Sequence, residues 1–223
     1  YEVTKALLKS QRLEFLITDF YVPDWLFYFE RLFPKSKLQK RHSSDIPSKY
    51  VKSSLLAFAY YFLYRKTGNL KFSLKRDKIL GKKARKIAIK KQCDLIAMSN
   101  FGQYAFQNFP FKKILFQYHP HPREIFQILN KELRNSKYST SSLYSEYEIG
   151  LTEDLLLKYE LEQKMADHII VASSFTKQSL LNQGIGSTKI SLAMYGFNPG
   201  IFKTIKNSNV IKNQLLFVGA LSS

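Results

Sequence analysis

Short apolar runs alternate along the chain with longer segments in which apolar residues recur at helical spacing. The runs that predict strands are residues 13–18, 94–98, 113–117, 168–172 and 189–194. β-branched residues in runs this short are typical of strands buried on both faces of a sheet. Helical spacing recurs over residues 2–11, 77–92, 101–108, 125–133, 151–166 and 175–182. This alternation predicts an α/β fold, with a Rossmann-like, doubly wound, mostly parallel sheet and helices on both faces.

The first half of the chain also contains an apolar helical segment, an aromatic segment and a basic segment. Residues 49–65 have helical spacing and are apolar over most of the circumference, with lysine or arginine at both ends. Such a helix suits the core of a domain, but it also suits a helix that lies on a membrane surface. The aromatic residues 25–33 predict a helix at the domain edge, and residues 67–76 predict a basic loop.

The stretch from His168 to Met194 predicts a strand, a helix and a second strand. Ser173 and Ser174 follow the first strand and are typical helix N-caps, and Gly184 follows the helix as a glycine C-cap would. Connections of this length are usual between neighbouring elements of a doubly wound sheet. The second strand is followed directly by the turn YGFNPG.

The order of motifs from Ala166 to Ser222 resembles that of the retaining glycosyltransferases of family 4. The motifs are ADHIIV-x-S-x-x-TK-x-x-L, then a glycine, KI and a strand, then YGFNP-x-x-F, and finally LLFVG-x-LS. This resemblance implies a two-domain GT-B fold. It implies an acceptor-side domain over residues 1–202 without its first strand, a linker over 203–214, and the start of a nucleotide-sugar domain over 215–223. We therefore expect the chain to be a fragment.

The same resemblance implies an activity and its substrates. A sugar would pass from a nucleotide-sugar donor to a glycan or lipid-linked acceptor, with retention at the anomeric carbon and without a metal or other cofactor. Gly219 matches the glycine that lets the donor phosphate approach, and Tyr195 and Gly196 lie in the matched turn. Ala220 stands where the family commonly has an arginine, and the family's later lysine and glutamate pair lie beyond Ser223. The chain alone is therefore expected to be inactive, and an inactive truncated glycosyltransferase is one alternative.

The turn Tyr118-His-Pro-His-Pro122 is the best candidate for chemistry within this chain. It follows the predicted strand 113–117, and ligands of open α/β sheets bind beyond the carboxyl ends of the strands. In the resembling family an aromatic residue and a histidine end this strand on the acceptor side, which points to Tyr118 and His119. His119 would hydrogen-bond the transferring sugar or the acceptor hydroxyl. His121 is the alternative candidate for this role, if the alignment with the family is shifted along the turn. A histidine beside prolines can equally cap the next helix.

Charge is concentrated in one window of the chain. The formal net charge is +18, and the window from Lys35 to Lys91 holds 18 lysines or arginines against only Asp45 and Asp77. A cluster of this kind favours anionic partners, of which we expect an anionic membrane surface. A basic Rossmann-like protein that binds nucleic acid is the rival interpretation, although no known nucleic-acid-binding motif is present.

Other common site types find little support. The sequence contains no phosphate-binding loop, no G-x-G-x-x-G and no G-x-S-x-G motif. Glu160 and Glu162 are two apart on a predicted helix, so they face different directions and do not form an acid–base pair. The single Cys93 excludes an internal disulfide or multi-cysteine metal site, and it predicts a buried, inert thiol and a cytoplasmic location. The basic window adds the expectation that the protein is peripheral on the inner face of the membrane. His42 and His168 are expected to be structural or solvated.

Overall fold

The structure is a computed structural model that describes residues 2–24, 26, 41–135, 144 and 147–196. The chain forms two compact units, which we describe separately. The first comprises Tyr1–Phe116 with Lys158–Ile169, and the second comprises Gln117–Leu157 with Ile170–Ser223. The predicted linker 203–214 and the predicted domain start 215–223 lie outside the described residues, as does most of the predicted helix 25–33.

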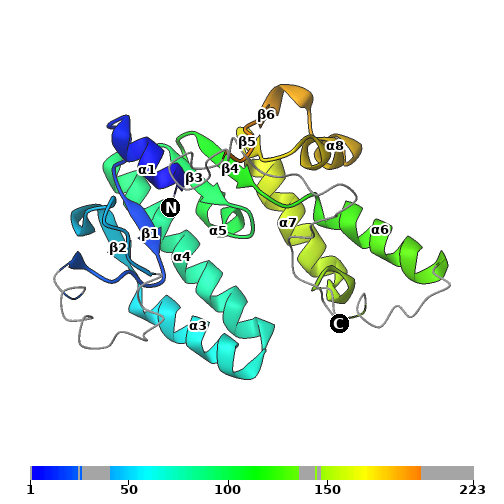
Figure 1. The fold of residues 1–223 in the computed structure, drawn as a ribbon, viewed down its shortest axis with the longest axis horizontal. Helices are drawn as coiled ribbons and strands as arrows, with labels where there is room; N and C mark the ends of the chain where they lie inside the picture. Colours follow the sequence, from blue (N-terminus) through cyan, green and yellow to red (C-terminus); the bar gives the residue numbers. More distant parts are fainter. Residues whose placement is uncertain (1, 25, 27–40, 136–143, 145–146, 197–223) are drawn as a thin grey trace, which may run out of the picture. The chain divides into compact units, whose positions relative to one another are not determined.

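Helices and strands are interspersed along the chain (Figure 1). The strands are β1 Leu16–Thr18, β2 Val51–Ser53, β3 Leu95–Met98, β4 Lys113–Gln117, β5 His168–Val171 and β6 Ile190–Leu192. The α-helices are α1 Glu2–Lys9, α3 Leu55–Thr67, α4 Leu70–Lys91, α5 Gly102–Phe106, α6 Pro122–Asn135, α7 Glu153–Met165 and α8 Ser174–Asn182. Two α-helices follow one another without a strand between them at α3 and α4 and again at α6 and α7. Single turns of 3₁₀-helix cover Ser48–Tyr50, Tyr147–Gly150 and Ser187–Lys189.

The strands belong to two sheets. β1 and β2 form a parallel pair in which Leu16 lies opposite Val51. β3, β4, β5 and β6 form a four-stranded sheet in that order, and β3 runs parallel to β4 with Leu95 opposite Lys113. Parallel strands connected through helices are the mark of an α/β fold. The predicted Rossmann-like α/β class is therefore confirmed.

Two local predictions in the first unit are wrong. The helix expected over residues 49–65 starts only at Leu55, because Ser54 caps it by accepting a hydrogen bond from the backbone N–H of Ala57, and β2 precedes it. The basic loop expected over residues 67–76 is mostly helix, since the side chain of Asn69 caps α4 by accepting from the N–H of Lys71. In both places a polar N-cap residue sets the boundary that apolar periodicity did not.

The core of the first unit lies where helices pack on β3 and β4. Leu115 of β4 and Ala88 of α4 are fully buried, and Phe106 of α5 is 2% exposed. α4 and α5 approach closely at Gly81, where an added Cβ would lie 2.7 Å from Cβ of Tyr104. Glycine permits the two helix backbones to meet at this distance.

The second unit has its own buried residues around α8. Leu180 of α8 and Val171 at the end of β5 are fully buried, and Leu156 of α7 is 2% exposed. Ser173 caps α8, as the sequence predicts: its Oγ accepts a 3.0 Å hydrogen bond from the N–H of Thr176. Gly184 follows this helix with a φ of +81°, a conformation that glycine adopts without strain.

Candidate functional site

The turn after β4 presents His119 to solvent. His119 is exposed, and its ring lies against that of Tyr118 with the centroids 4.3 Å apart at an interplanar angle of 55°. The backbone carbonyl of His119 accepts a 2.8 Å hydrogen bond from Nε2 of Gln117, the last residue of β4. The turn is therefore held by a buried strand residue, while the imidazole remains accessible.

Gln117 adds a polar feature that sequence reasoning missed. Its side chain is buried, with the residue only 3% exposed, and its Oε1 has no hydrogen-bond partner among the described residues. A buried amide oxygen without a donor costs on the order of 1–3 kcal/mol, so such atoms in folded proteins usually bind water or a ligand. The only sequence signal for this feature is a glutamine at the end of a predicted strand.

His121, the alternative in this turn, has a different environment. It is 2% exposed, and its Nδ1 accepts a 3.2 Å hydrogen bond from the backbone N–H of Arg123 in the first turn of α6. The His121 backbone N–H donates to Oγ of Ser179 over 2.8 Å, and its carbonyl accepts from Ile125. His121 therefore caps α6 and anchors it to α8. This is the helix-capping alternative that the sequence allowed for a histidine beside prolines.

Two of the three predicted donor-side residues, Tyr195 and Gly196, lie within the described residues and follow β6. Gly219, like Ala220, lies outside them. Tyr195 is 71% exposed, and nothing lies within 4 Å of a Cβ built on Gly196. Within the described part of the chain, no ring contact or hydrogen bond joins Tyr195 to His119.

A buried carboxylate organises the turn after β3 in the first unit. Glu162 of α7 is 1% exposed; its Oε1 accepts a 2.7 Å hydrogen bond from the N–H of Asn100, and its Oε2 a 2.9 Å bond from the N–H of Gly102. Burial raises the pKa of Glu162 to about 7, against the opposing effect of these backbone donors. Glu160, two residues earlier, instead lies 3.9 Å from Lys164, so the two carboxylates face different surroundings as the sequence predicts.

Asp77 is a second buried acid in the same unit. It lies on α4, is 7% exposed and forms a 2.7 Å ion pair with Arg76. Burial raises its pKa to about 6, and the negative charge of Asp77 also raises the pKa of Glu162. Both acids are enclosed by protein, which suits positioning of the α4, α5 and α7 segments better than contact with a substrate.

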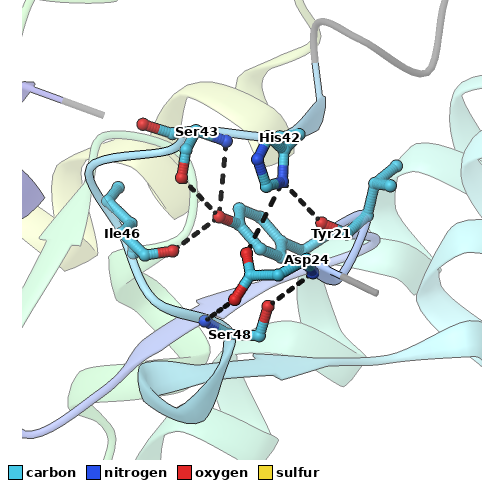
Figure 2. Close-up of polar contacts among 7 residues, drawn as sticks. Tyr21, Asp24, His42, Ser43, Ile46 and Ser48 are labelled. Carbon is cyan, nitrogen blue, oxygen red and sulfur yellow. Dashed lines mark hydrogen bonds and ion pairs between the residues drawn. The ribbon is translucent and has the colours of Figure 1, made fainter. Parts of the chain in front are cut away.

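A polar network closes the loops beyond β1. Figure 2 shows the hydroxyl of the buried Tyr21 at 2.6 Å from the carbonyl oxygen of Ile46 and 2.9 Å from that of Ser43. Nδ1 of His42 lies 3.0 Å from the carbonyl oxygen of Val22, and its side chain is 8% exposed. His42 was expected to be either structural or solvated, and its buried, hydrogen-bonded ring shows that it is structural.

The network in Figure 2 includes a second link between the same loops. The backbone N–H of Asp24 donates to Oγ of Ser48 over 3.0 Å, and the N–H of Ser48 returns a longer bond to Oδ2 of Asp24 over 3.4 Å. Oδ1 of Asp24 also lies 3.9 Å from Nδ1 of His42. These contacts hold residues 21–24 against residues 42–48, so the buried His42 ring serves the packing of these loops.

Metal ligation and thiol chemistry receive no support from the described residues. Within the described ranges, no three His, Cys, Asp or Glu side chains gather where they could hold a metal ion. Cys93 is only partly buried, rather than buried as expected, and burial raises the pKa of its thiol. A raised pKa lowers the thiolate fraction at neutral pH, so the expected inert character agrees with this environment.

Comparisons of the chain with protein-family models, with curated proteins and with solved structures find no match. The glycosyltransferase assignment therefore remains a prediction that depends on the motif series and on the turn at His119. None of the described helices has both the length and the apolar character needed to cross a membrane.

Proposed function

We propose that this chain is the acceptor-side domain of a retaining glycosyltransferase, which transfers a sugar from a nucleotide-sugar to a glycan or lipid-linked acceptor. The observation that carries the proposal is the accessible imidazole of His119 beyond the carboxyl end of β4. Ligands of open α/β sheets bind at this edge of the strands. The order of β5, α8 and β6 along the chain also supports the proposal, since the motif resemblance implies a strand, a helix and a strand there.

In this mechanism His119 positions the substrate by hydrogen bonding and is not the nucleophile. A ring nitrogen of His119 would hydrogen-bond a hydroxyl of the transferring sugar or of the acceptor, while the ring of Tyr118 limits its rotation. Gln117 holds this turn in place, because its Nε2 donates to the backbone carbonyl of His119. By the resemblance, hydrogen-bond donors of a second domain would stabilise the charge on the departing diphosphate.

The test uses the protein expressed from its full natural gene. Release of nucleoside diphosphate is measured with UDP-, GDP- and dTDP-sugars in the presence of glycan and lipid-linked acceptors. We expect turnover with one donor, reduced on the order of 100-fold in His119→Ala, as for removal of one hydrogen-bonding group from an active site. Gln127→Ala, an exposed residue of α6, is the matched control and should retain full turnover. Absence of turnover with every donor, or full activity of His119→Ala, would contradict the proposal.

A further inference from the structure

One face of α4 carries a continuous row of lysines. This lysine stripe consists of Lys71, Lys75, Lys78, Lys82, Lys86 and Lys90, all exposed. Steps of three or four residues place them on the same side of the helix. The helix has 22 residues, so the stripe extends over most of roughly 33 Å. Within the described residues, no carboxylate forms an ion pair with any of the six.

The other basic residues of α4 are used by the fold. Lys83 donates to the carbonyl oxygen of Ser53, and Arg85 donates to that of Gln107 over 2.6 Å. Arg76 and Lys91 form ion pairs, the latter with Glu14 over 2.8 Å. Among the described residues, the lysine stripe is thus the part of the basic surface of α4 that forms no ion pair, although Lys75 also lies over the ring of Tyr60. Six aligned positive charges repel one another, and an anionic surface would relieve that repulsion.

α3 exposes an apolar row on its outer face. This apolar stripe consists of Leu55, Leu56, Ala59, Phe62 and Leu63, and the side chains of Leu55, Leu56 and Phe62 are among the most exposed apolar groups, at 73%, 59% and 61%. Ala57 is the one buried residue of this helix. The core-helix interpretation is therefore wrong for the outer face of α3, because most of the surface of Leu55, Leu56 and Phe62 remains exposed.

The two stripes belong to one helical hairpin. α3 and α4 pack side by side and are joined through Gly68, whose φ of +68° ends α3 (Figure 1). Tyr60 of α3 stacks on Phe72 of α4 with the centroids 6.2 Å apart, and Nζ of Lys75 lies 5.6 Å from the centroid of Tyr60. Lys75 of the lysine stripe therefore lies beside α3.

We propose that the α3–α4 hairpin is a docking surface for membranes that contain anionic phospholipid. The lysine stripe would pair with lipid phosphates, and the apolar stripe would enter the headgroup region, as amphipathic surface helices do. A nucleic acid could pair with the lysines and stack a base on Phe62, but it offers no apolar surface that would cover Leu55 and Leu56. This surface is narrower than the whole basic window, and the inference does not depend on the glycosyltransferase proposal.

The test is flotation of the full chain with phosphatidylcholine vesicles and with vesicles that also contain phosphatidylglycerol. We expect binding to the anionic vesicles only, weakened by salt because exposed charges are screened. The triple variant Lys71→Gln, Lys78→Gln, Lys82→Gln should lower the partition coefficient roughly 100-fold, since each lysine near the surface contributes about fivefold. The control is a triple variant that removes the same number of positive charges away from α4: Lys9→Gln, Lys112→Gln, Lys131→Gln. Its partition coefficient should fall much less.

A second variant separates a membrane from other polyanions. Leu55→Ser with Phe62→Ser should weaken vesicle binding and leave binding to a single-stranded oligonucleotide unchanged. Equal binding to neutral and anionic vesicles would overturn the proposal, as would equal losses in the two lysine triples. Oligonucleotide binding without vesicle binding would also overturn it and would assign the lysine stripe to nucleic acid. Circular dichroism confirms that each variant is folded, which is expected because every substituted side chain is exposed or partly exposed.

Discussion

Oε1 of Glu162 accepts a 2.7 Å hydrogen bond from the backbone N–H of Asn100, across 62 positions of sequence. Asn100 has a φ of +77°, so a non-glycine residue holds a left-handed conformation at this turn. The carboxylate also accepts from Gly102, which begins α5. One buried acid on α7 thereby fixes the path of the chain from β3 into α5.

This arrangement predicts a specific dependence of stability on pH. Burial raises the pKa of Glu162 from 4.5 to about 7, so between these values the folded protein binds a proton that the unfolded chain has released. The stabilisation from this proton is fully present below about pH 4.5 and is lost as the pH rises through about 7. The loss is about 3 kcal/mol in the free energy of unfolding.

Urea unfolding at several pH values measures this loss. In Glu162→Gln the free energy of unfolding should vary much less between pH 4.5 and 7. Glu132→Gln, at an exposed position of α6, should leave the pH dependence of the free energy of unfolding unchanged. Burial raises the pKa of Asp77 to about 6, so its proton also stabilises the fold at low pH. Asp77→Asn should therefore remove part of the fall in the free energy of unfolding between pH 3.8 and 6. Identical profiles for the wild type and Glu162→Gln would contradict the assignment.

A close helix contact predicts the effect of one added methyl group. In Gly81→Ala the new Cβ would meet Cβ of Tyr104 at 2.7 Å and the backbone nitrogen of Ala105 at 3.0 Å. Neither atom is the end of a flexible side chain, so α4 and α5 must separate, at a cost of about 1–3 kcal/mol. Gly150→Ala meets nothing within 4 Å and serves as the control. Equal free energies of unfolding for the two variants would show that the contact is absent.

The two histidines of the candidate turn should differ in their effect on stability. His121→Ala removes the N-cap of α6, leaves the N–H of Arg123 without its acceptor and empties a buried site, so it should cost about 2 kcal/mol or more. His119→Ala removes an exposed ring and should change the free energy of unfolding by less than about 0.5 kcal/mol. Chemical denaturation distinguishes them, and a large loss for His119→Ala would show that this ring is structural.

Adjacent serines at the start of α8 test the N-cap assignment. Ser173→Ala removes the oxygen that accepts from the N–H of Thr176 and should lower stability by about 1 kcal/mol. Ser174→Ala changes an exposed residue within the helix and should have little effect or be slightly stabilising. Thermal unfolding of the pair measures the difference, and the reverse order would move the cap by one residue.

Much of the fold can be predicted from local sequence signals. β4 has the predicted bounds, and β5, α8 and β6 follow the predicted order, because β-branched runs, a serine cap and a glycine end are local features. β2 could not be predicted in this way, since its three residues are continuous with the apolar pattern of α3. Its strand character comes from pairing with β1, a partner more than thirty residues away.

The candidate site is predictable only in part. His119 could be selected from its position after a strand, and its exposure agrees with that choice. The burial of Glu162, Asp77 and Gln117 could not be predicted, because charged and amide side chains are usually exposed and their burial depends on distant segments. The outward orientation of the apolar stripe of α3 was likewise set by tertiary packing, which leaves only Ala57 of that helix buried.

Nucleoside diphosphate release by the full natural protein and its His119→Ala variant tests the central claim most directly. The two proteins are compared at equal concentration, at a temperature where both are folded, with each nucleotide-sugar in turn. The account predicts turnover by the wild type with one donor and a loss on the order of 100-fold in the variant. Equal turnover by the two proteins, or none by the wild type with any donor, would contradict it.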